Sequence, residues 1–182
     1  MGKCILVTGG ARSGKSQFVL EQAAKTGKPV LFVATAEPGD EEMQARIEVH
    51  KKNRPANWKT LEARANLGNE IEKNIGDAQT VIIDCITLLA NNIFMDGVSK
   101  TGQFSESKVE AALNAEIEGL LACAGRFKSK FLIVTNEVGM GIVPEHPMSR
   151  LYRDLLGKAN QKLAQKADEV YLLVAGLQLR VK

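Results

Sequence analysis

Eight consecutive residues near the start of the chain have the types and spacing of a phosphate-binding loop. Residues 9–16, GGARSGKS, match the pattern G-x-x-x-x-G-K-[ST]. Glycines let backbone N–H groups turn toward phosphate oxygens, and the N-terminus of the next helix adds a partial positive charge. We expect Lys15 to reach the outer phosphates and Ser16 to offer its hydroxyl to Mg²⁺. The pattern predicts a nucleoside triphosphate site formed by Gly9, Gly10, Ala11, Arg12, Ser13, Gly14, Lys15 and Ser16.

The segments on both sides of this loop have the character that the motif requires. Residues 4–7 (CILV) are apolar and predict a buried strand, and residues 17–25 (QFVLEQAAK) favour a helix. Strand, glycine-rich loop and helix in this order form the structural context of a nucleotide-binding P-loop. The alternative is a chance glycine-rich turn, which would not predict the strand and the helix around it.

A second candidate for the phosphate site is an acidic residue at the end of an apolar run. Asp84 follows residues 81–83 (VII), where P-loop proteins place the carboxylate that holds Mg²⁺ through water. Ser16 and Asp84 are therefore the predicted metal residues. The alternative is that Asp84 only caps the helical segment that follows it.

His50 lies in a basic segment that suits a polyphosphate. Lys51, Lys52 and Arg54 follow it closely, and such cations would favour a neutral, nucleophilic imidazole. The alternative is that His50 only borders the apolar stripe of a helix, beside solvated lysines. His146, in a predicted loop, has the character of a turn residue.

Two further segments could take part in binding. Residues 136–144 (NEVGMGIVP) follow a predicted strand and carry Glu137 and two glycines, which suit a loop that closes over a substrate. This segment lacks the N-K-x-D guanine signature of regulatory GTPases. Glu62 could accept hydrogen bonds from a ribose or a guanine edge, although an ordinary surface carboxylate has the same spacing.

The elements that must position these residues alternate between strand-like and helix-like. The apolar runs are nearly continuous, as in parallel strands covered on both faces. Strands are predicted over 4–7, 29–33, 58–61, 80–83, 131–135, 169–174 and 177–181, and helices over 17–25, 41–52, 66–75, 87–96, 107–124 and 149–166. The predicted helix ends are an N-cap at Asp40 for residues 41–52, a stop at Gly97 after residues 87–96, and a capping box that starts at Ser107 for residues 107–124. We predict one α/β domain over residues 1–182, doubly wound and mostly parallel, with a C-terminal β-hairpin.

Composition excludes several other classes of protein. A net charge of +3 on 182 residues is too small to predict nucleic-acid binding. The three cysteines have no metal-site spacing, and no apolar stretch reaches the roughly 18 residues of a membrane span. Because Met1–Lys3 run directly into the first strand, no signal peptide is expected and the predicted location is the cytoplasm.

Taken together, these segments resemble the bifunctional adenosylcobinamide kinase/adenosylcobinamide-phosphate guanylyltransferases of cobalamin biosynthesis. The resemblance covers nearly the whole chain. It rests on residues 7–16, 34–36, 45–47, 50–51, 54–56, on Trp58 with Thr60 and Glu62, and on 135–144. Two positions depart from the family pattern: Val49 precedes His50 where some members have a second histidine, and Asp84 stands where others have Glu.

The resemblance implies a P-loop NTPase of the RecA-like type with two activities. The enzyme phosphorylates adenosylcobinamide with ATP or GTP and then transfers GMP from GTP to the adenosylcobinamide phosphate through a histidine–GMP intermediate. It implies catalytic roles for His50 and Lys15, a Mg²⁺ cofactor and a cytoplasmic homotrimer. The nucleotide contacts that it implies beyond residues 9–16 are Ala34, Thr35, Ala36, Lys51, Lys52, Asn53, Arg54, Glu62 and Asp84.

Two other functions remain open at the level of the sequence. The first is a small-molecule kinase without guanylyltransferase activity, in which His50 is structural. The second is a RecA-like ATP-binding module that acts on nucleic acid or protein, and this function would require a broader basic surface than the local charge around His50.

Overall fold

The computed structural model describes residues 2–37, 41–52, 54–99 and 104–182, with seven strands and six helices among them. The side chains of residues 42, 43, 46, 49, 50, 52 and 99 lie outside this description. The strands are β1 (Cys4–Gly9), β2 (Val30–Ala34), β3 (Lys59–Glu62), β4 (Thr80–Asp84), β5 (Lys130–Val134), β6 (Glu169–Val174) and β7 (Leu177–Arg180). The helices are α1 (Lys15–Ala24), α2 (Glu41–Lys52), α3 (Leu67–Asn74), α4 (Ile86–Ser99), α5 (Glu106–Arg126) and α6 (Pro147–Lys166).

All strands join one sheet in the order β3-β2-β4-β5-β1-β6-β7. Every neighbouring pair is parallel except β6 and β7, which form the predicted C-terminal hairpin. One strand, β5, separates β1, which leads into the P-loop, from β4, which ends at Asp84. The doubly wound α/β fold predicted from the sequence is therefore confirmed.

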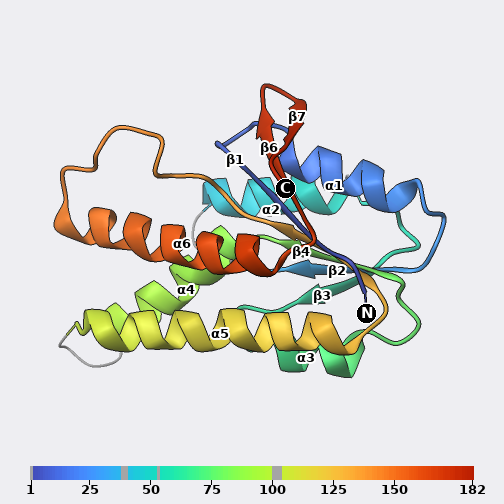
Figure 1. The fold of residues 1–182 in the computed structure, drawn as a ribbon, viewed down its shortest axis with the longest axis horizontal. Coiled ribbons are helices and arrows are strands. Elements are labelled where there is room, and N and C mark those ends of the chain that lie inside the picture. The colour runs from blue at the N-terminus through green and yellow to red at the C-terminus, as the bar shows by residue number, and fades with distance from the viewer. Residues whose placement is uncertain (1, 38–40, 53, 100–103) are drawn as a thin grey trace.

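Alternation along the buried strands divides the core between the two faces of the sheet. Leu6, Val81 and Ile83 pack toward α3, α4, α5 and α6, whereas Val7 and Ile82 pack toward α1. Figure 1 shows the sheet between α1 on one side and α3 and α5 on the other. Both faces are apolar because both are covered, which explains the continuous hydrophobic runs in the sequence.

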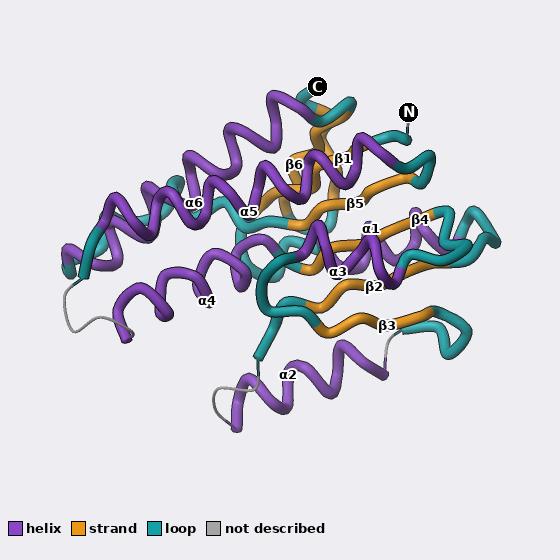
Figure 2. The backbone as a smooth tube through the Cα atoms, turned by 90° about the horizontal axis from the view of Figure 1, so that it is seen from below, coloured by secondary structure: helices purple, strands orange, loops and turns teal. Residues whose placement is uncertain are grey.

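Helix α2 is placed differently from the other helices. Figure 2 shows it beside β3, at the outer edge of the sheet rather than over the centre of a face. Its sequence, EEMQARIEVHKK, is mostly polar, so little apolar surface is available to fix it.

Two predicted helix ends are wrong. Helix α4 continues through Gly97 to Ser99, because the absent side chain of Gly97 leaves room for Val109 of α5 to approach closely. Helix α5 begins at Glu106 with Ser105 as its N-cap, and Ser107 lies inside the helix rather than at the start of a capping box. At Gly97, the packing of α4 against α5 outweighs the local preference for a stop. The cap predicted at Asp40 lies outside the described residues.

Candidate active site

The six parallel strands bring their carboxyl ends to one edge of the sheet, and the P-loop begins there. Gly9 ends β1, and Ala34 and Asp84 are paired at the ends of β2 and β4. Two backbone bonds, from Thr35 N to the Asp84 carbonyl (3.2 Å) and from Glu137 N to the Gly9 carbonyl (3.0 Å), continue these pairings beyond the strands. The predicted phosphate loop, Asp84 and the loop after β5 therefore share one edge.

The P-loop has the backbone that its glycines predict. Gly14 is the N-cap of α1 with φ +97°, a left-handed conformation that favours glycine. A side chain at Gly14 would also lie 3.2 Å from the Cα of Gly176, in the turn between β6 and β7. The Gly176 N–H donates to the Ser13 carbonyl at 3.0 Å. The hairpin turn thus supports the P-loop, a contact that no local sequence pattern predicted.

Lys15 is buried against the loop that carries it. Its Nζ donates to the Gly10 carbonyl at 2.6 Å and lies 3.5 Å from Ser13 Oγ, and only 7% of the residue is exposed. Burial lowers the pKa of Lys15, while the nearby Cys85 and Asp84 act in the opposite direction. Ser16 lies next to it in the first turn of α1, half-buried. The predicted P-loop lysine thus lies inside the loop and close to the predicted metal carboxylate.

Arg54 brings a second cation to Asp84. Its guanidinium carbon lies 3.8 Å from the centre of the Phe32 ring of β2, a cation–π contact. Burial lowers the pKa of Arg54, and the negative charges of Asp84 and Glu62 partly offset this effect. In the described part of the chain, its Nε and Nη1 atoms are buried without a hydrogen-bond partner. These donors fit an additional acceptor, such as a phosphate oxygen.

Glu62 links this row of charges to α2. Its carboxylate forms an ion pair with Lys51 Nζ at 2.8 Å, and the hydrogen bond to Glu62 raises the pKa of Lys51. Charged groups therefore follow one another from Lys15 through Asp84, Arg54 and Glu62 to Lys51. The structure joins four segments here, and Lys15 and Asp84 are far in the sequence from the other two.

The segment after β2 is held by buried polar groups. Thr35 is fully buried, and its hydroxyl both donates to the Cys85 carbonyl (2.7 Å) and accepts from the Cys85 N–H (2.8 Å). Ala34 is buried and Ala36 is half-buried on either side of it. Three residues expected to contact the nucleotide are thus fixed next to Asp84.

The loop after β5 is fastened at its base. Thr135 Oγ1 donates to Asn160 Oδ1 at 2.7 Å, and the Asn160 amide donates to the Asn136 carbonyl at 3.0 Å. The Asn136 N–H donates to Thr87 Oγ1 at 2.8 Å. This loop therefore starts from a fixed point beside the P-loop, and its closure over a substrate stays a prediction.

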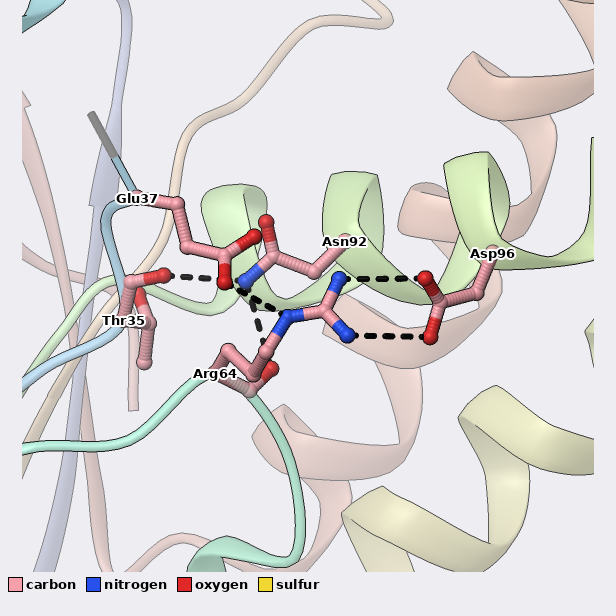
Figure 3. A network of polar contacts seen from close by, with 5 residues as sticks. All are labelled: Thr35, Glu37, Arg64, Asn92 and Asp96. Carbon is pink, nitrogen blue, oxygen red and sulfur yellow. Dashed lines mark hydrogen bonds and ion pairs between the residues drawn. The ribbon is translucent and has the colours of Figure 1, made fainter. Parts of the chain in front are cut away.

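A polar network that no sequence pattern indicated lies at the same edge (Figure 3). Arg64 follows β3, and its guanidinium pairs with Glu37 (2.7 Å) and makes two bonds to Asp96 (3.0 and 3.1 Å). Asn92, buried in α4, donates to the Thr35 carbonyl at 3.0 Å and to the Arg64 carbonyl at 3.2 Å. The members come from three separate segments, so no spacing could have identified them.

Three predicted site residues cannot be placed in the same detail. The backbone of His50 belongs to α2, immediately before Lys51, but its side chain and that of Lys52 lie outside the described side chains. Asn53 lies outside the described residues altogether. Within the described part of the chain, no three His, Cys, Asp or Glu side chains gather to hold a metal ion. A cation at Ser16 and Asp84 would thus need the phosphates of the nucleotide as further ligands.

The sheet order, the P-loop and the carboxylate on β4 define a P-loop NTPase of the RecA-like class. A solved structure agrees: the crystal structure of the RadB recombinase matches with a TM-score of 0.50 over 94% of this chain and 74% of that one. At 13% identity this likeness shows the fold alone. In the described ranges no helix is long and apolar enough to cross a membrane.

Within that class the family is shown by sequence. The chain belongs to the cobinamide kinase/cobinamide phosphate guanyltransferase family, which matches residues 5–181. It is 42% identical over 180 residues to the bifunctional adenosylcobalamin biosynthesis protein CobU of Escherichia coli K12, covering 98% of this chain and 99% of that protein. The CobU protein of Salmonella typhimurium LT2 matches with the same identity and coverage. The CobP protein of Pseudomonas aeruginosa is 36% identical over 97% of this chain and 96% of its own.

Proposed function

We propose that this enzyme phosphorylates adenosylcobinamide and then transfers GMP to the product, using one carboxyl edge of the sheet for both reactions. Family membership supports the kinase and guanylyltransferase activities. The observation that carries the assignment of residues is the row of charges from Lys15 to Lys51, because it connects the P-loop to the helix that contains His50.

The kinase step uses the P-loop. The backbone N–H groups of residues 9–16 and the Lys15 ammonium bind the triphosphate of ATP or GTP, and the hydroxyl of adenosylcobinamide attacks the γ-phosphorus. The bond from that phosphorus to the β,γ-bridging oxygen breaks and the nucleoside diphosphate leaves. Phosphoryl transfer requires positioning and charge neutralisation more than covalent help, and a buried lysine in a fixed loop provides both.

The residues present fit a Mg²⁺ ion. Asp84 and the Ser16 hydroxyl are hard oxygen ligands, and Asp84 is close enough to Lys15 to influence its pKa. Asp84 would hold the ion through water and Ser16 directly, with phosphate oxygens as the other ligands. The bound ion would neutralise charge on the β- and γ-phosphates.

The guanylyl step uses His50. Its imidazole attacks the α-phosphorus of GTP, pyrophosphate leaves, and a phosphoramidate joins GMP to the protein. A phosphate oxygen of adenosylcobinamide phosphate then attacks the same phosphorus, which gives adenosylcobinamide-GDP and frees the histidine. Lys51 and Arg54 stabilise charge on the leaving pyrophosphate, with Lys52 and Asn53 as further contacts. Ala34, Thr35, Ala36 and Glu62 complete the nucleotide contacts.

A labelling experiment tests this proposal. Protein incubated with α-labelled GTP in the absence of corrinoid should keep the label after denaturation, resist alkali and lose the label in acid, as a P–N bond does. His50→Ala should lose the label, while His146→Ala should keep it. The kinase activity should survive in His50→Ala, because direct phosphoryl transfer needs no covalent histidine. Undiminished labelling of His50→Ala would contradict the assignment of the nucleophile.

The same adduct separates this function from the alternatives. A kinase without guanylyltransferase activity would take no label at His50. A RecA-like module that acts on nucleic acid would hydrolyse ATP faster with DNA or RNA present, and the small net charge gives that function no support. Oligomeric state and location follow from the family resemblance, and we infer a cytoplasmic homotrimer. The exposed apolar side chains of Leu177 and Leu179 on the hairpin support an association surface.

A further inference from the structure

The polar network of Figure 3 connects the core helix α4 to the chain that leads into α2. Arg64 is its central member. Its guanidinium binds Asp96 of α4 through two bonds, and its Nε atom binds Glu37 at 2.7 Å. Glu37 lies in the connection between β2 and α2, so this ion pair holds a point of that connection beside α4.

The last turn of α2 contacts residues at the carboxyl end of β3, close to Arg64. Lys51, in the last turn of α2, pairs with Glu62, the final residue of β3, at 2.8 Å. Arg64 is only two residues further along the chain. The carboxyl end of β3 therefore contacts the last turn of α2 through Glu62 and the connection before α2 through Arg64.

The segment that makes these contacts is itself rigidly placed. Asn92 is 7% exposed and donates one bond to the Arg64 carbonyl and another to the Thr35 carbonyl. The backbone N–H of Ala63 donates to the Ala34 carbonyl at 3.0 Å. Arg64 is thus held through its backbone and through its side chain, and it presents a planar fork that suits two carboxylates at once.

We propose that Arg64 is a positioning residue for guanylyl transfer: by holding Glu37 against α4, it sets the place of the helix that carries His50. This inference rests on the proposed function of His50. It concerns only the second reaction, because the kinase step uses Lys15 and the P-loop, whereas the contacts of Arg64 among the described residues are with Glu37, Asp96 and Asn92. A displacement of about 1 Å in a reacting group can lower a rate by roughly a hundredfold, so a small shift of α2 should be measurable.

We expect the ion pairs of Arg64 to contribute little to folding. Its side chain is 42% exposed and that of Glu37 is 48% exposed, and exposed ion pairs contribute little to the free energy of unfolding. An Arg64→Gln protein should therefore fold, and its kinase activity reports this directly. One protein thus provides both the reaction under test and its control.

The experiment compares two initial rates in Arg64→Gln: labelling by α-labelled GTP without corrinoid, and phosphorylation of adenosylcobinamide by ATP. We expect labelling to fall by roughly tenfold to a hundredfold while phosphorylation stays at the wild-type rate. Glu37→Gln should act in the same direction, and the double variant should be no worse than Arg64→Gln, because both changes remove one interaction. Arg64→Lys should restore labelling only in part, since an ammonium lacks the fork.

A matched variant removes an ion pair elsewhere on the surface. Glu110→Gln breaks the 2.7 Å pair with Lys158 that joins α5 to α6, and it should change neither rate. Wild-type labelling of Arg64→Gln would overturn the inference, and so would an equal fall in both reactions, which would indicate a general structural role. A wild-type protein that takes no label would instead overturn the proposed function on which the inference rests.

Discussion

Asp84 shows how one residue depends on its neighbours at this edge. It ends β4, influences the pKa of Lys15 on one side and that of Arg54 on the other, and its carbonyl accepts from Thr35. Lys15 and Arg54 thus place positive charge near this carboxylate from two different segments of the chain. Such a group is suited to hold a hydrated divalent cation, whereas a helix cap would need no second cation beside it.

Replacement of this carboxylate tests its role at the residue scale. Asp84→Asn keeps the shape of the side chain and removes the charge, so the Mg²⁺ concentration for half-maximal kinase activity should rise by about tenfold. Asp77→Asn, an exposed residue after α3, is the matched control and should leave the Mg²⁺ titration unchanged. An unchanged titration for Asp84→Asn would favour the alternative, in which this residue only caps the helical segment that follows it.

At the scale of elements, the contact between α3 and α5 depends on a missing side chain. A Cβ atom on Gly68 would lie 2.6 Å from the Gly119 carbonyl oxygen, so α3 approaches the backbone of α5 closely. A Cβ on Gly119 itself would meet nothing within 4 Å. Gly68 therefore has no room for a side chain, whereas Gly119, in the same helix interface, has room for one.

This difference gives a prediction for helix packing. Gly68→Ala should lower the free energy of unfolding by about 1–3 kcal/mol, because the two helices must separate. Gly119→Ala should raise it by up to about 1 kcal/mol, because alanine favours the interior of a helix. Thermal melts of the two variants should shift in opposite directions, and shifts of the same sign would contradict the proposed packing.

At the scale of the whole molecule, three buried thiols report on whether residues 1–182 form one domain. Cys4 is in β1, Cys85 follows β4 and Cys123 is in α5. Burial raises the pKa of each thiol from 9.0 to about 11. In the folded protein these groups are therefore neutral and inaccessible at neutral pH.

We expect all three thiols to become reactive together. In a denaturant series at pH 8, labelling by a thiol reagent should follow one transition that coincides with the loss of helical circular dichroism. Reaction of one thiol at a lower denaturant concentration would show a separate folding unit. Because the folded pKa values lie above the unfolded ones, the contribution of these thiols to the free energy of unfolding should be constant below about pH 9 and fall as pH rises toward 11.

The sequence by itself determined the features that depend on a continuous stretch of chain. The P-loop is one such feature, because its glycines, its lysine and the helix that follows occupy adjacent positions. The apolar runs of the strands are another, and they indicated a sheet covered on both faces. The family resemblance could also be recognised from these local motifs, although the exact ends of α4 and α5 could not.

Tertiary structure decided which distant residues meet. Arg64 contacts Glu37 and Asp96 only because β3 lies beside β2 and α4 begins where β4 ends. Gly176 reaches the P-loop only because β6 pairs with β1, and Gly97 stays helical only because Val109 packs against it. Each of these contacts joins segments far apart in the chain, so its energy depends on the order of the strands and is absent from any local pattern.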